Sequence, residues 1–294
     1  MSIKHYLIIL LVVLFTSCGN DGYNTPNVAS PVIYSTNVEI LTDTTALLEM
    51  EECETEYHYG LNELYFQDNN MLIFGVRFVF FIKEPTLVDF SPTVSNAIKR
   101  LNMDFEPANI GFKAIETRLI EDQEAYNGMH YYQKFAFKYY ERNTLNIFVF
   151  PNTAEPPISG AALGIPGTSM VIKSFFLDKS TISHEVGHLF GLYHTHKKDV
   201  SDTNNNDNGD YVCDTPNADQ FSDHNRGFLG KVDAECFYTS QNELSVEEND
   251  ILIHNLMSYS SVNCRCCITE VQIKRMRWII ENSLDLRSCL QLSL

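Results

Sequence analysis

The chain has 294 residues, with 21 Lys and Arg against 38 Asp and Glu, which gives a formal net charge of −17. An acidic balance of this size repels phosphate backbones, so we expect no nucleic-acid partner. Hydrophobic residues make up 44% of the chain, enough for a sizeable core, and the 8 Cys make the cellular compartment the first question.

The N-terminus predicts export from the cytoplasm. Lys4 precedes an apolar run at residues 6–15, which is too short to span a membrane as a helix. Phe-Thr-Ser-Cys at 15–18 resembles a bacterial lipobox, which implies a lipoprotein signal peptide at 1–17 and a lipid on Cys18. An ordinary signal peptide is the alternative. We therefore expect a periplasmic or cell-surface protein of a bacterium, held to the membrane only through a lipid anchor, with secretion as the other possibility.

The mature chain is predicted to begin with two segments that precede the main domain. Residues 18–36 are rich in turn formers and are interpreted as a tether. Residues 37–70 are acidic and are interpreted as a pro-segment or N-terminal extension. The main domain is predicted at 71–294.

Residues 71–176 predict a sheet and its helices in chain order. Buried strands are expected where Phe, Val and Ile cluster between turn signals, and a helix is expected from Ser91, as N-cap, and Pro92. The small residues at 159–164 predict an exposed edge strand. The other predicted strands are 71–82, 111–120, 145–150 and 169–176. This order favours an α+β fold with a mixed sheet.

Beyond residue 176 the pattern changes. A helix is predicted from Ser180 or Thr181, residues 195–255 are polar and loop-like, and a capping box of Thr269 and Gln272 predicts a final helix.

The segment His-Glu-Val-Gly-His-Leu-Phe-Gly-Leu-Tyr-His at 184–194 carries the chemistry. On a helix, His184 and His188 project from one face and can bind one Zn²⁺. Glu185 can take a proton from a water in the open coordination position. Gly191 permits a left-handed turn, after which His194 can return as the third ligand. This pattern predicts an open, catalytic zinc site.

The pattern HExxHxxGxxH is similar to that of the metzincin metalloproteases, which implies a methionine in a tight turn beneath the zinc. Asn-Leu-Met-Ser-Tyr at 255–259 fits this turn, with Met257 as its methionine. Tyr259 is expected near the metal, where its hydroxyl would stabilise the oxyanion of a tetrahedral intermediate.

Further motifs narrow the resemblance to the pappalysin (cytophagalysin) family. They are Gly-Asp-Tyr-Val-Cys-Asp-Thr-Pro at 209–216 and Leu-Asn-Met-Asp-Phe at 101–105. The family implies a mixed sheet with two helices above a zinc cleft and an irregular C-terminal subdomain with a final helix below it, in subdomains 71–194 and 195–294. It also implies that an extended peptide pairs with the edge strand. Ser260 and Ser261 follow Tyr259 where some relatives carry acidic residues, so a preference for basic substrates is not expected.

The Asp- and Asn-rich residues 201–210 offer hard oxygen ligands suited to Ca²⁺, although EF-hand spacing is absent. The family resemblance implies a structural calcium to which Asp210, Asp214 or Thr215 contributes; a solvated loop is the alternative.

Apart from Cys18 and Cys53, all cysteines follow the predicted zinc helix and are candidates for disulfides. The favoured single pair is Cys213–Cys236. Cys53 precedes the main domain, where its thiolate could occupy the open zinc position and keep the protein latent. A disulfide between Cys53 and a C-terminal cysteine is the alternative.

We therefore expect a zinc-dependent endopeptidase that hydrolyses protein or peptide substrates, with Glu185 as general base. Two alternatives remain at this point: a non-catalytic surface binding protein on the same fold, and a zinc hydrolase of a cell-wall peptide amide. The intact ligand set argues against the first, because a decayed site usually loses a ligand or the base.

Overall fold

The computed structural model describes residues 70–85, 87–128, 132–155, 158–195, 210–212, 214–216, 232–239 and 245–291. All of them belong to one compact unit, Tyr59–Leu294. The predicted signal peptide, tether and pro-segment, with Cys18 and Cys53, lie outside the described residues, as does Cys213. Within the described residues, no helix is long and apolar enough to cross a membrane.

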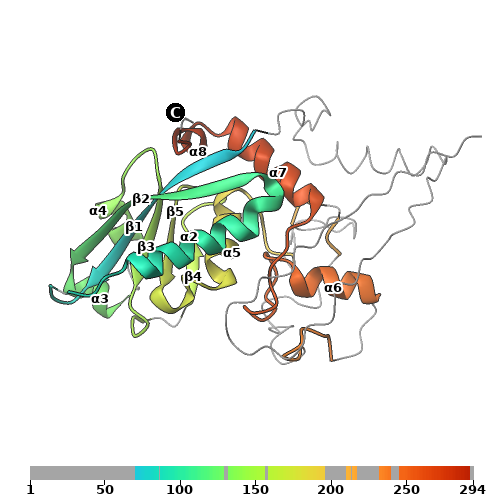
Figure 1. The fold of residues 1–294 in the computed structure, drawn as a ribbon, viewed down its shortest axis with the longest axis horizontal. Helices are drawn as coiled ribbons and strands as arrows, with labels where there is room; N and C mark the ends of the chain where they lie inside the picture. Colours follow the sequence, from blue (N-terminus) through green and yellow to red (C-terminus); the bar gives the residue numbers. More distant parts are fainter. Residues whose placement is uncertain are drawn as a thin grey trace, which may run out of the picture. The chain divides into compact units, whose positions relative to one another are not determined.

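A five-stranded mixed sheet in the order β2-β1-β3-β5-β4 forms the centre of the fold (Figure 1). Four strands run parallel, and the short edge strand β4 runs antiparallel to β5. The central strands have near-continuous apolar sequences because both of their faces are buried. Their bounds are β1 Leu72–Ile82, β2 Ile110–Glu121, β3 Leu145–Phe150, β4 Gly160–Ala162 and β5 Ser169–Lys173.

Helices cover both faces of the sheet. On one face, the apolar sides of α2 (Ser91–Phe105), α5 (Ser180–Leu189) and α7 (Glu270–Asn282) share a core with β1 and β3. On the other, α3 (Gln123–Asn127) and α4 (Tyr132–Tyr139) pack over a smaller cluster that includes Phe81, Phe148 and Phe150. The predicted strands and the mixed sheet are confirmed, with the edge strand at the predicted place in the sequence.

Several local predictions were wrong. The helix at residue 91 has Phe90 at its N-cap, and the Asp89 Oδ1 accepts the Ser91 N–H at 2.9 Å, so Ser91 is inside the helix. Residues 174–176 form a 3₁₀ turn instead of extending β5. The structure also contains helices that were not predicted, namely α3, α4, α6 (Val246–His254) and α8 (Leu284–Ser288).

The missed helix α6 lies within the region interpreted as loop. Its start carries a capping box in which Ser245 accepts the backbone N–H of Glu248 and Glu248 accepts that of Ser245. This is the same signal that correctly predicted α7 from Thr269 and Gln272.

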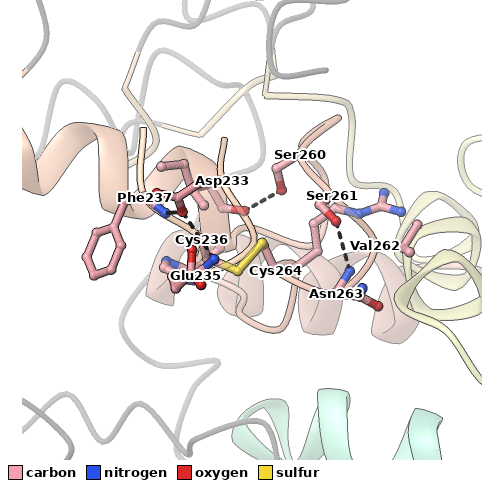
Figure 2. The surroundings of a disulfide bond; sticks show 12 residues. Asp233, Glu235, Cys236, Phe237, Ser260, Ser261, Val262, Asn263 and Cys264 are labelled. Carbon is pink, nitrogen blue, oxygen red and sulfur yellow. Dashed lines mark hydrogen bonds between the residues drawn. A yellow bond between two sulfur atoms is a disulfide. The ribbon is translucent and has the colours of Figure 1, made fainter. Parts of the chain in front are cut away.

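Cys236 forms a disulfide with Cys264, across a Cα–Cα distance of 5.6 Å (Figure 2). The predicted Cys213–Cys236 pair is therefore wrong, because a cysteine forms only one such bond. The reason is local: Asp233 Oδ1 accepts backbone N–H groups of Glu235 and Phe237, and this turn presents Cys236 to the segment that follows the 255–259 turn.

Candidate active site

Helix α5 supplies the first part of the site, and every one of its residues is buried. The helix ends at Leu189, and Gly191, two residues further on, has φ +88°, the left-handed turn that the sequence predicted. An added Cβ there would lie 2.1 Å from Ile279 Cδ1, so glycine is required by both conformation and space. Arg275 Nε, from α7, donates to the Gly191 carbonyl at 2.8 Å. This turn returns the chain to bring His194 beside the helix.

The three histidines converge on one point. His194 Nε2 lies 3.1 Å from His184 Nε2 and 3.0 Å from His188 Nε2. The donor atoms of a tetrahedral zinc centre with bonds of about 2.0–2.1 Å stand roughly 3.3 Å apart. Among the described residues, this is the group of His, Cys, Asp and Glu side chains that could hold a metal ion.

The other ring nitrogens fix the tautomers. His184 Nδ1 lies 2.6 Å from the Leu256 carbonyl, and His188 Nδ1 lies 2.7 Å from the Leu192 carbonyl. Because a carbonyl can only accept, we assign the ring protons to Nδ1. The Nε2 atoms of these two rings then carry lone pairs, and each lies within 3.1 Å of His194 Nε2, an arrangement that a cation bound by the three nitrogens would stabilise. Burial, and then the charge of Arg265, lower the pKa of His184 well below its usual value. The donor set therefore fits Zn²⁺.

Glu185 is buried beside the edge strand. Its Oε2 accepts the Ala162 N–H at 2.9 Å. Burial raises the pKa of Glu185 to about 7, with the Ala162 hydrogen bond and the Arg265 charge opposing that rise. An added Cβ on Gly160 would lie 3.0 Å from Glu185 Cγ and 3.1 Å from Oε1. The backbone of β4 can therefore approach the Glu185 carboxyl this closely because residue 160 has no side chain. The arrangement orients the carboxyl of Glu185 against β4, with a pKa near neutrality, on the same helix as His184 and His188.

Met257 lies fully buried beneath the helix. Asn255 Oδ1 accepts the Met257 N–H at 2.8 Å, and the Met257 carbonyl accepts the Thr195 N–H at 3.3 Å. An added Cβ on Gly187 would lie 2.5 Å from Met257 Sδ, so the turn approaches α5 where the helix has no side chain. Met257 therefore packs against α5 at Gly187.

Tyr259 completes the group. Its ring lies edge-on to His194, with centroids 4.6 Å apart, and 6.0 Å from the His184 ring centroid. The structure thus brings the three histidines and the ring of Tyr259 together, while Glu185 lies on the same helix and Met257 packs against that helix at Gly187.

The predicted calcium residues have other partners. Asp214 accepts the Thr269 hydroxyl at 2.7 Å and the Val271 N–H at 2.8 Å, so both oxygens serve the start of α7. Thr215 Oγ1 donates to Asp210 Oδ2 at 2.5 Å. Burial raises the pKa of Asp210 to about 7. Residues 201–209, which held the rest of the predicted ligands, lie outside the described part of the chain.

Sequence reasoning missed two buried arginines at this site. Arg275 stacks near the rings of Tyr193 and Tyr211 while it holds the end of α5. Arg265 lies against His184, and burial lowers the pKa of its guanidinium to about 10, so it stays charged near neutrality. Arg275 lies in the predicted final helix and Arg265 in an irregular segment. Neither arginine belongs to a sequence motif that would indicate a role at the metal site.

Comparison with known proteins supports the chemistry of this site. Residues 149–281 match the family model Peptidase_M43, described as pregnancy-associated plasma protein-A. The chain is 28% identical over 241 residues to an extracellular metalloprotease of Colletotrichum graminicola, covering 70% of this chain and 79% of that one. It is 35% identical over 97 residues to an extracellular metalloprotease of Aspergillus fumigatus, covering 33% of this chain and 26% of that one.

Among solved structures, metalloproteinase-II from Bacteroides fragilis aligns with a TM-score of 0.33 and 12% identity, over 48% of this chain and 47% of that chain. That likeness is too weak to carry an argument, so the assignment rests on the sequence matches and the histidine cluster. The family match covers α5 and the 255–259 turn, the two segments that build the site. Residues 149–281 therefore resemble the pappalysin family of metalloproteases, and the sequence matches support a metalloendopeptidase.

Proposed function

We propose that this chain is a zinc endopeptidase in which His184, His188 and His194 hold the metal and Glu185 is the general base. The observation that supports it most directly is that His184 Nε2 and His188 Nε2 lie 3.1 and 3.0 Å from His194 Nε2. When bound, zinc lowers the pKa of a coordinated water towards ~7 and polarises a substrate carbonyl.

The chain's own residues supply the proton transfers. Glu185, with its pKa raised to about 7, accepts the proton of the attacking water and passes it to the leaving amine. The Tyr259 hydroxyl donates a hydrogen bond to the developing oxyanion, from a ring that already contacts that of His194. Both groups act from buried or packed positions, which reduces the reorganisation that each step requires.

The substrate is proposed to bind as an extended peptide along β4. This strand pairs with β5 on one side only, and it lies against Glu185 through Gly160 and Ala162. An edge strand offers backbone donors and acceptors to a peptide, which gives affinity without requiring a particular side chain. The scissile bond would then pass beside the base.

The test is incubation with a mixed peptide library, with and without a zinc chelator. Cleavage at internal bonds that stops with chelator and returns with Zn²⁺ supports the endopeptidase. Zinc binding without any cleavage would favour a non-catalytic binding protein on this fold. Cleavage restricted to cell-wall peptide amides would favour the amide hydrolase.

Two further features are proposals of the same kind. We infer that Cys18 carries a lipid anchor, and Cys18→Ala should then move the protein from the membrane fraction to the soluble fraction.

We also infer that Ca²⁺ binds near Asp210, whose buried carboxyl a cation would keep ionised. Added Ca²⁺ should raise the melting temperature of the wild type and leave that of Asp210→Asn unchanged. The latency role for Cys53 stays a prediction, because that residue lies outside the described part of the chain.

A further inference from the structure

Arg265 is a buried cation on the far side of His184 from the metal position. It is only 6% exposed. Its Nη1 lies 3.0 Å from His184 Nδ1 and donates to the Ser258 carbonyl at 3.1 Å, while Nη2 lies 3.5 Å from Thr181 Oγ1. Its Nε is buried and has no hydrogen-bond partner in the described structure. One side chain therefore contacts helix α5 and the turn beneath it at the same time.

Near His184, the ring Nδ1 and the Arg265 Nη1 are both donors, and each has its own backbone carbonyl as acceptor. A guanidinium has no acceptor atom, so the Nδ1 proton of His184 goes to the Leu256 carbonyl. Arg265 Nη1 then donates to Ser258. These two carbonyls flank Met257, so the ring of the first histidine and the guanidinium hold the two sides of the same turn.

A second set of contacts anchors Arg265 to helix α2. Arg100 Nη2 donates to the Arg265 carbonyl at 3.1 Å, and Arg100 Nε donates to Asp104 Oδ2 at 2.7 Å. Asp104 is 2% exposed and supplies the negative charge near both arginines. The contacts therefore run from the sheet-covering helix, through Arg265, to the histidine.

The backbone of Arg265 is also held on both sides. The preceding residue, Cys264, is tied to Cys236 by the disulfide (Figure 2), and the N–H of the following residue, Cys266, donates to the His254 carbonyl at 2.9 Å. A segment fixed in this way presents the guanidinium in one place. Burying a charge with an unpaired nitrogen is costly, and a well-packed apolar side chain often serves folding as well. The cost suggests a role beyond packing.

We propose that Arg265 is a positioning residue that locks the turn at Met257 to helix α5 and thereby holds His184 Nε2 in its metal-binding place. This inference rests on the proposed zinc function. It predicts that the loss of Arg265 weakens the metal site more than it weakens the fold, because groups that orient metal ligands tune affinity without touching the metal.

The experiment compares the full chain with Arg265→Met, Arg265→Lys and a matched control, Arg77→Met. Arg77 is also buried, but it lies in the sheet and bonds Glu116, Asn146 and the Tyr139 carbonyl. Zinc dissociation constants are measured by competition with a coloured chelator, and the visible spectrum of the Co²⁺-loaded protein reports ligand geometry. Thermal melts of the metal-free proteins report the fold.

Arg265→Met is expected to weaken zinc binding about 10- to 100-fold and to change the Co²⁺ spectrum, whereas Arg77→Met leaves both near wild-type values. Arg265→Lys keeps the charge but not the planar fork, so we expect a loss of about 3- to 10-fold. If Arg265→Met does not fold, the zinc dissociation constant of Arg265→Lys tests the inference instead.

Unchanged zinc affinity in a folded Arg265→Met protein, or in Arg265→Lys if only that variant folds, overturns the inference alone. An equal loss in Arg77→Met also overturns it, since the effect would then be general destabilisation. A wild type that does not bind zinc overturns the proposed function and this inference together, so the two failures are distinguishable.

Discussion

Gly160 illustrates how a single missing side chain shapes the chemistry. Its backbone passes so close to Glu185 that an added Cβ would lie 3.0 Å from Cγ and 3.1 Å from Oε1. The added Cβ would also lie 3.2 Å from the backbone carbonyl oxygen of Val171. The methyl group can therefore be accommodated only if the Glu185 carboxyl moves. The position of the general base is therefore set by the edge strand as well as by its own helix.

Gly160→Ala should accordingly lower kcat for peptide hydrolysis by about tenfold or more, since small misplacements of a catalytic group are costly. The zinc content should stay unchanged, because the three atoms nearest the added Cβ belong to Glu185 and Val171 and none to a histidine. Gly111→Ala is the matched control: its added Cβ would meet no atom closer than 3.7 Å. Equal kcat in the Gly160 variant and this control would contradict the proposed placement of Glu185.

The protonation of Glu185 gives a prediction about pH. Its carboxylate is the active base, and burial raises its pKa to about 7, so activity should fall as pH drops through that value. The charge of bound zinc lowers the pKa of a nearby carboxyl, so the midpoint should lie at or below about 7. The measurement is kcat/KM against pH from 5 to 9. An activity that rises as pH falls from 7 to 5 would be incompatible with Glu185 as a base.

At the scale of elements, the close contact between α5 and the turn at Met257 governs the site. Gly187→Ala should stabilise the helix by about 0.5–1 kcal/mol through backbone entropy, but an added Cβ 2.5 Å from Met257 Sδ should cost about 1–3 kcal/mol through overpacking. We expect the second effect to prevail, giving a net loss of stability and weaker zinc binding.

A double-mutant cycle with Met257→Ala checks this contact. Removing the thioether gives the new methyl room, so the effects of the two substitutions should be less than additive in chemical unfolding. Additive losses would show that the helix and the turn do not compete for that space.

The strands β1, β3 and β5 could be predicted from the sequence because they are apolar runs bounded by turn residues, whereas their order within the sheet depends on pairings between distant segments. The histidine cluster could be predicted because its spacing is a property of one helix and one glycine turn. Arg265 and the Cys236–Cys264 pair could not, because both depend on how the irregular segment folds back against α5 and α6. Helix α6 was missed although its Ser245–Glu248 capping box is present, since polar neighbours obscured it.

At the scale of the molecule, the Cys236–Cys264 disulfide joins residues 28 apart in sequence and crosslinks the segment that follows the 255–259 turn. Closing a loop of this length is worth about 2–4 kcal/mol, mainly by restricting the unfolded chain. Cys236→Ser with Cys264→Ser should therefore lower the stability of the folded unit by that amount, measured by denaturant unfolding.

Cys289→Ser provides the control for the loss of a cysteine without the loss of a crosslink. Cys289 is buried, and burial raises the pKa of its thiol to about 11, so it is unreactive near neutrality. If the double variant and this control unfold at the same denaturant concentration, the disulfide does not contribute as expected.

We propose above that the three histidines hold zinc and that Glu185 activates water there. The most direct measurement pairs zinc content with peptide cleavage in the wild type and in Glu185→Gln, which keeps the shape of the side chain but removes its basicity. We predict an equal zinc content near one ion per chain in both proteins, and a loss of cleavage of about 10³-fold or more in the variant. Undiminished cleavage by a zinc-loaded Glu185→Gln protein would contradict the account.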